Sequence, residues 1–165
     1  MTHDELVVRA VKWLRRPARA QNWSKGGCGV VVPELVSYAP EQPDAIGWSQ
    51  GCSYVVECKC SSADFRADQA KTHRAIGAGL YRLYLCEPNI IMLDELPSGW
   101  GLLYCHAREV TVEAVPAPNM SRNLRYELAM MYSLLRRVEV RGELTRCLAP
   151  KWSGDIEWAD AKAGA

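Results

Sequence analysis

The feature of this sequence that most constrains its fold is a pair of short, strand-like segments joined by a tight turn. Residues 44–48 and residues 54–60 contain β-branched and aromatic side chains, and Ser49-Gln50-Gly51 lies between them. Two such segments around a short glycine-containing turn are typical of a β-hairpin. The pattern therefore predicts two neighbouring strands in the middle of the first half of the chain.

Helical and strand-like patterns lie on both sides of this hairpin. Thr2 and Glu5 have the spacing of a capping box, and apolar residues follow at helical spacing, which predicts a helix over 4–16 that stops near Pro17. The expected fold class is α/β, with a central mixed β-sheet flanked by helices. Further strands are expected over 30–36, 80–86, 101–106 and 109–115, and further helices over 63–78 and 121–141.

The length of 165 residues suits one domain with a buried core. Residues 1–118 are expected to form this core, and Pro116-Ala117-Pro118 is the clearest linker. Residues 119–150 are then expected to form a basic helix that packs on the same domain. The Gly- and Ala-rich residues 151–165 are expected to form a flexible tail.

Composition favours a cytoplasmic protein. The seven cysteines are scattered without a CxxC pair, which is typical of free thiols in a reducing compartment and not of a zinc knuckle. The sequence has no apolar run of the length that crosses a bilayer, and its first residues lack the apolar core of a signal peptide. No membrane partner is therefore expected.

Positive charge is unevenly distributed, although the formal net charge is only +1. Between Lys12 and Lys25 there are five basic residues and no acid, and between Asn119 and Lys151 there are seven basic residues against three acids. Such islands can follow the phosphates of a nucleic acid, or they can simply solvate helix faces. The candidate phosphate-contacting residues are Lys25, Lys71, Arg122 and Arg125.

The second strand of the hairpin carries the residues that indicate chemistry. Side chains alternate along a strand, so Glu57 and Lys59 are expected on one face, and Val56 and Cys58 on the apolar face. Charged groups on a buried strand are costly unless something compensates them. A divalent cation shared with Asp44, at the start of the partner strand, would do so.

This set of residue types suits metal-assisted hydrolysis of a phosphodiester. Mg²⁺, with Mn²⁺ as a substitute, prefers carboxylate oxygens such as those of Asp44 and Glu57, and the backbone carbonyl of Cys58 is a further candidate ligand. A cation held there would polarise a phosphate and lower the pKa of a bound water. Lys59 would orient or deprotonate that water, or stabilise charge on the phosphate; the sequence leaves these roles open.

The combination of Asp44 with Glu57-Cys58-Lys59 resembles the signature of the PD-(D/E)XK nuclease superfamily. The residues that follow, from Glu57 to Asp68, are similar to the strand-to-helix segment of the MmcB-like DNA repair family, which begins its helix with Asp-Phe-x-x-Asp. Residues 81–85 and 99–104 fit two later strands of that pattern, so the resemblance covers roughly residues 34–106.

The resemblance implies a restriction-endonuclease-like core and a metal-dependent nuclease that acts on DNA, possessing the catalytic set Asp44, Glu57 and Lys59. It also implies two further acidic ligands, Glu5 on the first helix and Glu34 on the first strand. The residues themselves allow other roles: Glu5 fits a capping box, and Glu34 fits a solvent-facing strand edge.

Three readings of the function stay open. The favoured one is a Mg²⁺-dependent DNA endonuclease or exonuclease, of DNA repair, phage or mobile-element background. The alternatives are a catalytically weak nucleic-acid-binding or adaptor protein on the same fold, and a phosphodiesterase that acts on RNA or small nucleotides. No appended recognition domain is visible, so structure- or end-directed cleavage is favoured over sequence-specific cleavage. A homodimer is compatible with all three.

Overall fold

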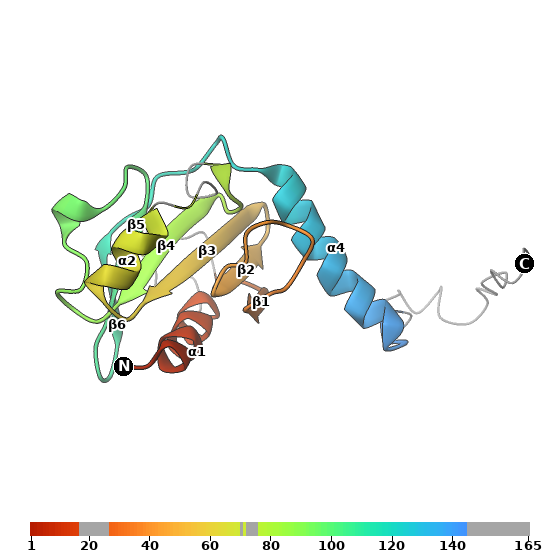
Figure 1. Cartoon of the computed structure of the whole chain (residues 1–165). Helices are drawn as coiled ribbons and strands as arrows, with labels where there is room; N and C mark the ends of the chain where they lie inside the picture. The colour runs from red at the N-terminus through yellow and green to blue at the C-terminus, as the bar shows by residue number, and fades with distance from the viewer. Residues whose placement is uncertain (17–26, 70, 72–75, 145–165) are drawn as a thin grey trace, which may run out of the picture.

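The protein folds around a six-stranded mixed β-sheet (Figure 1). The computed structural model describes residues 1–16, 27–69, 71 and 76–144. The strands lie side by side in the order in which they occur in the sequence. Neighbouring strands are antiparallel, except that β3 pairs in parallel with β4 and β4 with β5. The strands are β1 (Val30–Pro33), β2 (Ala45–Ser49), β3 (Cys52–Lys59), β4 (Tyr81–Cys86), β5 (Gly101–Cys105) and β6 (Val110–Ala114).

One face of the sheet is covered by helix α1 (His3–Leu14). This helix begins with the predicted capping box, in which Thr2 and Glu5 exchange side-chain and backbone hydrogen bonds. Its apolar stripe, which includes Leu6, Ala10 and Trp13, is buried against the sheet. The same core contains the side chains from β3 to β5 that point toward α1, among them Val56, Cys58, Leu83, Leu85 and Leu103.

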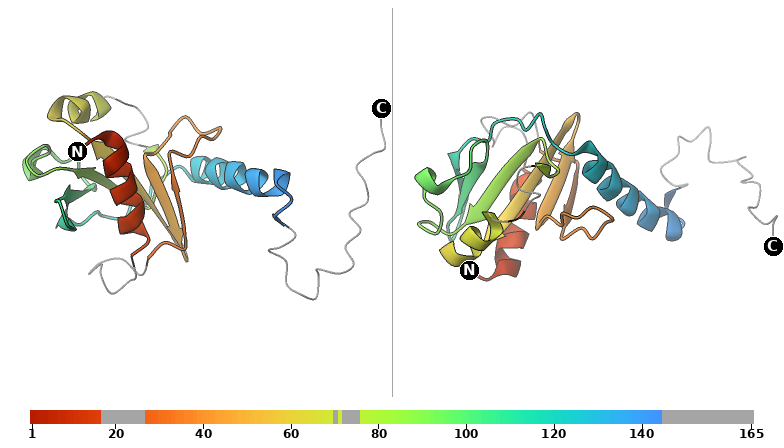
Figure 2. Two further views of the ribbon diagram at one scale, coloured as in Figure 1. Left: turned by 90° about the horizontal axis from the view of Figure 1, so that it is seen from below. Right: turned by 45° about the horizontal axis from the view of Figure 1, so that its top comes forward.

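The other face of the sheet packs against two further helices (Figure 2). Helix α2 (Ser62–Gln69) inserts Phe65 beside Tyr84, and helix α4 (Leu124–Val140) inserts Met130 beside Val55. The 3-10 turn η2 (Leu93–Glu95) lies between β4 and β5 in the sequence. The face opposite α1 is therefore covered by two separate apolar clusters.

The predicted hairpin is confirmed as β2 and β3, which pair from Ser49 and Cys52 at the turn to Ala45 and Val56. Gly51, in the turn, has a φ of +77°, a conformation that a residue with a Cβ adopts only at a cost. The strands predicted over 80–86, 101–106 and 109–115 are likewise present as β4, β5 and β6. The expected α/β class with a central mixed sheet is correct.

Three predicted boundaries are wrong by three residues or more. The first strand ends at Pro33, short of residue 36, because the next residue, Glu34, has a φ of 43° and leaves the extended conformation. The second helix ends at Gln69, and Lys71 is not helical. The last helix begins at Leu124 and not at 121, because the Asn123 side chain caps it by accepting from the next turn.

Some expectations fall outside the residues that the structure describes. These are the basic residue Lys25, residues 145–150 of the expected C-terminal basic segment, and the expected tail over 151–165. None of the helices in the described part of the chain combines the length and the hydropathy that a membrane-spanning helix needs.

A buried ion pair fastens the 34–43 loop to the sheet. The Glu41 carboxylate accepts from the guanidinium of Arg82 on β4 and, at 2.6 Å, from the backbone N–H of Ala78. Both charged side chains are almost completely buried, Glu41 at 1% and Arg82 at 2% exposure. Removal of one partner from an ion pair this deep leaves an uncompensated buried charge, which strongly destabilises the fold.

Removing one member of this pair should therefore destabilise the protein more than removing both. We expect Glu41→Ala to lower the free energy of unfolding by about 3–5 kcal/mol, because it leaves the Arg82 charge buried without its carboxylate. The double variant Glu41→Ala/Arg82→Met should lose clearly less. Urea denaturation of the three proteins measures this; equal losses in the single and double variants would contradict a coupled pair.

Candidate catalytic centre

The candidate centre lies where β3 and β4 end, on the face opposite α1. Glu57 and Lys59 sit opposite Tyr84 and Cys86 in the last pairs of the parallel ladder. They share one face, as the alternation predicts, and the Lys59 Nζ lies 3.7 Å from Glu57 Oε2. Cys58 points the other way and is 1% exposed in the core beneath α1.

Asp44 joins these residues from the neighbouring strand. It directly precedes Ala45, the partner of Val56, so it enters the sheet beside Glu57. Its Oδ2 accepts a hydrogen bond of 2.7 Å from the backbone N–H of Cys58, which fixes the carboxylate across the hairpin. The structure thus brings Asp44, Glu57 and Lys59 together at one end of the central strands.

The electrostatics of Asp44 reflect this crowding. Burial, and next the negative charge of Glu57, raise the pKa of Asp44 to about 6. The hydrogen bond from Cys58 and the charges of Lys59 and His3 act in the opposite direction and only partly offset the rise. A proton or another cation near Asp44 and Glu57 would relieve the repulsion between the two carboxylates.

Asp68 is the residue that the sequence interpretation missed. Phe65 and Asp68 lie one turn apart on α2 and are its two buried residues, so both face the sheet. The Asp68 carboxylate lies 3.1 Å from Lys59 Nζ and accepts from the Tyr84 hydroxyl at 3.1 Å. Asp68 is the last residue of the Asp-Phe-x-x-Asp pattern. Its i, i+3 spacing from Phe65 is the sequence signal that could have placed it on the buried side of the helix.

Asp68 also engages Lys71, a candidate phosphate-contacting residue. Lys71 Nζ lies 3.0 Å from Asp68 Oδ1, while the lysine side chain remains 53% exposed. Lys71 is therefore close to the centre and open to a ligand at the same time. The positive charge of Lys59 is compensated by two carboxylates, those of Glu57 and Asp68.

His3 is a second residue that sequence reasoning did not select. It is the first residue of α1, and its Nε2 lies 3.5 Å from Asp44 Oδ1 and 3.9 Å from Glu34 Oε1. Glu34 approaches because its backbone N–H donates to the Asp44 carbonyl at 3.0 Å. His3 and Glu34 form the outer, solvent-facing side of the centre, and nothing in the sequence spacing links His3 to Asp44.

The two further acids expected as ligands have different surroundings. Glu34 is 59% exposed and reaches the centre through His3. Glu5 closes the capping box, where its carboxylate accepts from the Thr2 N–H at 2.8 Å. The capping role stated as the alternative for Glu5 is the one that the structure shows.

The metal expectation can be tested against the donor set. Among the described residues, no group of three or more His, Cys, Asp and Glu side chains is arranged to hold one metal ion. Two carboxylates with mutual repulsion are present, Asp44 and Glu57. Mg²⁺ often binds through one or two protein carboxylates and keeps several waters, so this pair fits Mg²⁺ better than a metal that needs a full protein cage.

The basic residues at the start of α4 lie elsewhere. The backbone N–H of Asn123, next to Arg122, donates to the Gly77 carbonyl, which precedes β4, so α4 starts at the opposite end of the strands from Glu57. Arg122 Nε lies 3.2 Å from Glu127 Oε1. The structure does not bring Arg122 and Arg125 to the centre, and Arg122 is paired with Glu127 instead.

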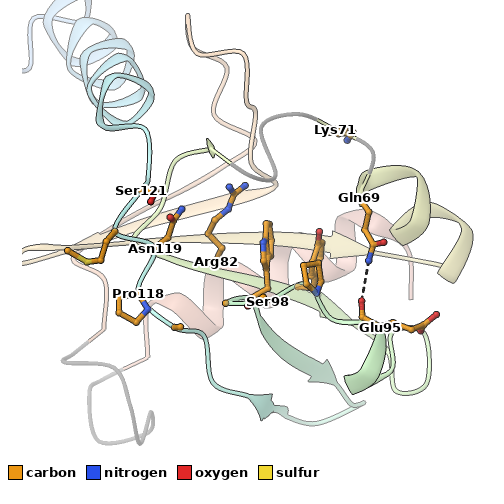
Figure 3. A pocket seen from close by; sticks show the side chains of 14 residues that line it. Gln69, Lys71, Arg82, Glu95, Ser98, Pro118, Asn119 and Ser121 are labelled. Atoms are coloured by element: carbon orange, nitrogen blue, oxygen red, sulfur yellow. Dashed lines mark hydrogen bonds between the residues drawn. The ribbon is translucent and has the colours of Figure 1, made fainter.

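A large pocket opens beside the centre (Figure 3). It has a volume of about 960 Å³ and runs from Gln69 and Lys71 at one side to Asn119 and Ser121 at the other. Its floor comes from β4 and the residues just before β5, where Arg82 lies 4.4 Å from the Trp100 ring centroid and Tyr84 stacks on the same ring at 4.3 Å. Tyr84 belongs to both the pocket and the Asp68 contact.

Comparisons with known proteins add a fold likeness. No protein-family model matches the chain, and no curated protein matches it. Among solved structures, it is similar to a protein of unknown function from Silicibacter pomeroyi, with a TM-score of 0.57 and 20% sequence identity. The likeness covers 87% of this chain and 92% of that protein, and at this identity it concerns the fold alone.

Because the pKa of Asp44 is raised, replacing Asp44 with the neutral asparagine should stabilise the folded protein by an amount that depends on pH. The folded protein holds the Asp44 proton more tightly than the unfolded chain, whose pKa is near 3.8, so this group's contribution to stability falls as the pH rises from about 4 to about 6. Asn keeps an acceptor for the Cys58 N–H. We therefore expect Asp44→Asn, in EDTA, to raise the free energy of unfolding by about 1–3 kcal/mol at pH 7.5.

Most of that gain should disappear at pH 4, where Asp44 of the wild-type protein is protonated. Urea denaturation at the two pH values measures it. Asp44→Ala is the control, because it removes the charge and also the acceptor for the Cys58 N–H. An Asn variant that is less stable than the wild type at pH 7.5 would show that the folded protein does not disfavour the charged form of Asp44.

Proposed function

We propose that this protein is a Mg²⁺-dependent nuclease that hydrolyses phosphodiester bonds in DNA, built on a restriction-endonuclease-like core. The observation that carries the proposal is the meeting of Asp44 and Glu57 at the end of the hairpin, with the Lys59 ammonium 3.7 Å from Glu57. Two crowded carboxylates suit a Mg²⁺ ion, and a lysine beside them can stabilise negative charge, which is a set of side chains that fits metal-assisted phosphodiester hydrolysis.

Asp44 and Glu57 would hold the cation, which supplies charge neutralisation of the phosphate and a more acidic bound water. Lys59 contributes a positive charge of its own. It lies between Glu57 and Asp68, and its three N–H donors give it capacity for a phosphate oxygen beyond these two carboxylates. Its role is therefore stabilisation of the negative charge that develops on the phosphate.

Asp68 acts as a positioning residue for Lys59. It is 1% exposed and its carboxylate is shared among Lys59, Lys71 and the Tyr84 hydroxyl. A carboxylate with three fixed partners cannot rotate freely, so the lysine that it contacts is held in one orientation. Lys71, on the rim of the pocket, is then placed to contact the phosphate backbone of the substrate.

The order of elements supports the fold part of the proposal. A helix, a three-stranded antiparallel meander, a second helix and a strand added in parallel to β3 bring the end of β3 next to α1 and α2. The resemblance of residues 34–106 to PD-(D/E)XK nucleases rests on the same segment. The likeness to the Silicibacter pomeroyi protein adds no activity, because that protein's function is unknown.

One observation favours a second function, a nucleic-acid-binding protein without catalysis. Glu57 is 3% exposed and Lys59 is 4% exposed, so the two side chains at the middle of the centre have little contact with solvent. A buried Glu57–Lys59–Asp68 network can also serve as a structural element. Under this reading, Lys71 and the pocket bind the phosphate backbone, and no bond is cut.

A cleavage assay separates the two functions. We expect the wild-type protein to cut at least one substrate among single-stranded, duplex and branched DNA and RNA in Mg²⁺ or Mn²⁺, and to cut none in EDTA. Asp44→Ala, Glu57→Gln and Lys59→Met should each lower the rate by at least about 100-fold, the usual effect of removing an electrostatic group of the transition state. Asp94→Asn, a change at an exposed acid on η2, is the matched control.

Cleavage that survives in EDTA, or full activity of Lys59→Met, would overturn the nuclease mechanism. Binding of DNA without cleavage in either metal would establish the binding function instead.

Substitution of the positioning residue Asp68 should change the catalytic rate more than it changes substrate binding. We expect Asp68→Asn to lower kcat with little change in KM, because Lys59 loses its fixed orientation while the pocket is unaltered. Asp68→Glu should restore part of the rate. Steady-state kinetics on the substrate found above measures both constants, and an unchanged kcat per folded molecule would assign Asp68 a purely structural role.

A further inference from the structure

Helix α4 has two apolar sides, and one of them has no cover among the described residues. Its inner side carries the buried residues Met130 and Ser133, which face the domain. On the opposite side, four large apolar side chains follow each other with a substantial part of their surface in solvent. They are Leu124 at 61%, Leu128 at 68%, Met131 at 45% and Leu135 at 53% exposure, and we call them the outer stripe of α4.

The spacing of the outer stripe is that of a helix-pairing seam. Its members are separated by four, three and four residues, the alternation by which two helices pack knobs into holes. A continuous apolar seam of this kind on an exposed helix is uncommon for a surface that stays in water. Figures 1 and 2 show α4 extending away from the sheet. The exposed side chains of the outer stripe are therefore accessible to another helix.

We propose that the outer stripe of α4 packs against the same stripe of a second copy of this chain, with the two helices antiparallel. An antiparallel pair centred near Met131 brings the start of one α4 beside the end of the other. Leu124 and Leu128 of one copy then face Leu135 and the residues after it in the other. The arrangement is two-fold symmetric, the commonest symmetry of soluble homodimers.

Charge complementarity selects a second copy and the antiparallel direction. Arg125 and Glu139 are both exposed and lie on the same edge of the stripe, on either side of Tyr132. Antiparallel pairing places Arg125 of each copy beside Glu139 of the other, which gives two opposite-charge contacts at the rim. A parallel pair would place Arg125 and Glu139 on the opposite side of the seam from the same residues of the partner, so the two charges would not meet.

The other edge of the stripe is held by the domain itself. Glu127 lies 3.2 Å from Arg122 and accepts from the Ser53 hydroxyl at 3.0 Å and the Gly79 N–H at 3.1 Å. These contacts anchor the start of α4 to β3 and to the residues before β4. The outer stripe therefore points in a fixed direction, which is the preorganisation that a weak interface needs.

The size of the helix sets the strength of the dimer. With 17 residues, α4 is about 25 Å long, so two such helices bury less area than a standard interface. A dimer in reversible exchange with the monomer at micromolar concentration is the expected result. This inference does not depend on the nuclease proposal, because the outer stripe and the Glu57 centre lie on different parts of the fold.

Sedimentation velocity of the full chain over a series of micromolar concentrations tests the proposal. The wild-type protein should shift from monomer to dimer across the series. Leu128→Glu/Leu135→Glu should weaken the dimer at least about 100-fold, because it removes four buried leucine side chains per dimer. Leu93→Glu is the matched control: Leu93 is 58% exposed on η2, and its change should leave the equilibrium unaltered.

Substitutions at Arg125 and Glu139 test independently that the two α4 helices are antiparallel. Arg125→Glu alone should weaken the dimer, and Arg125→Glu/Glu139→Arg should restore it. All these positions are exposed, so circular dichroism and the Tm should stay close to those of the wild type.

A wild-type protein that remains monomeric at every concentration overturns the proposal and assigns the outer stripe to another occupant, either residues 145–165 or a different protein. An equal loss of dimer in Leu93→Glu, or a charge exchange that fails to restore it, overturns the assigned interface.

Discussion

Lys59 carries its charge on a strand that is covered on both faces, and the surrounding structure is arranged so that this charge has partners. Glu57, two residues earlier, reaches it along the strand, and Asp68 reaches it from α2 at 3.1 Å. Burying a charge without such partners costs several kcal/mol, so the position of α2 on the sheet and the identity of residue 68 are coupled to Lys59. The Tyr84 hydroxyl and Lys71 are further partners of the Asp68 carboxylate.

The local part of this arrangement could be predicted from the sequence. Alternation along 54–60 separates Glu57 and Lys59 from Cys58, and the short turn after Ser49 brings Asp44 back beside them. The contacts of Asp68 and His3 were not predicted, because they depend on where whole helices pack. Asp68 reaches Lys59 because α2 packs on the sheet, and His3 reaches Asp44 because α1 begins near the end of the hairpin. Sequence spacing carries no direct record of such docking.

The charge islands show a different limit of sequence reasoning. A count of basic residues over 119–151 gives an excess of positive charge, but it does not say which acids are close in space. Arg122 forms an ion pair with Glu127, and the Glu127 carboxylate also accepts hydrogen bonds from the Ser53 hydroxyl and the Gly79 N–H. The charges at the start of α4 therefore help to attach this helix to the sheet. The exposed apolar residues of the outer stripe are the more informative surface of α4.

The hydrogen bond from the Cys58 N–H to Asp44 has a consequence for the order of folding. It lies within the hairpin, and so closes a short loop, whereas the contact of His3 with Asp44 and the parallel pairing of β3 with β4 close longer ones. Short loops close faster, since the entropy lost on closure grows with loop length. The carboxylate pair is thus expected to assemble early, as a local unit, and the fold then encloses an acidic site that already exists.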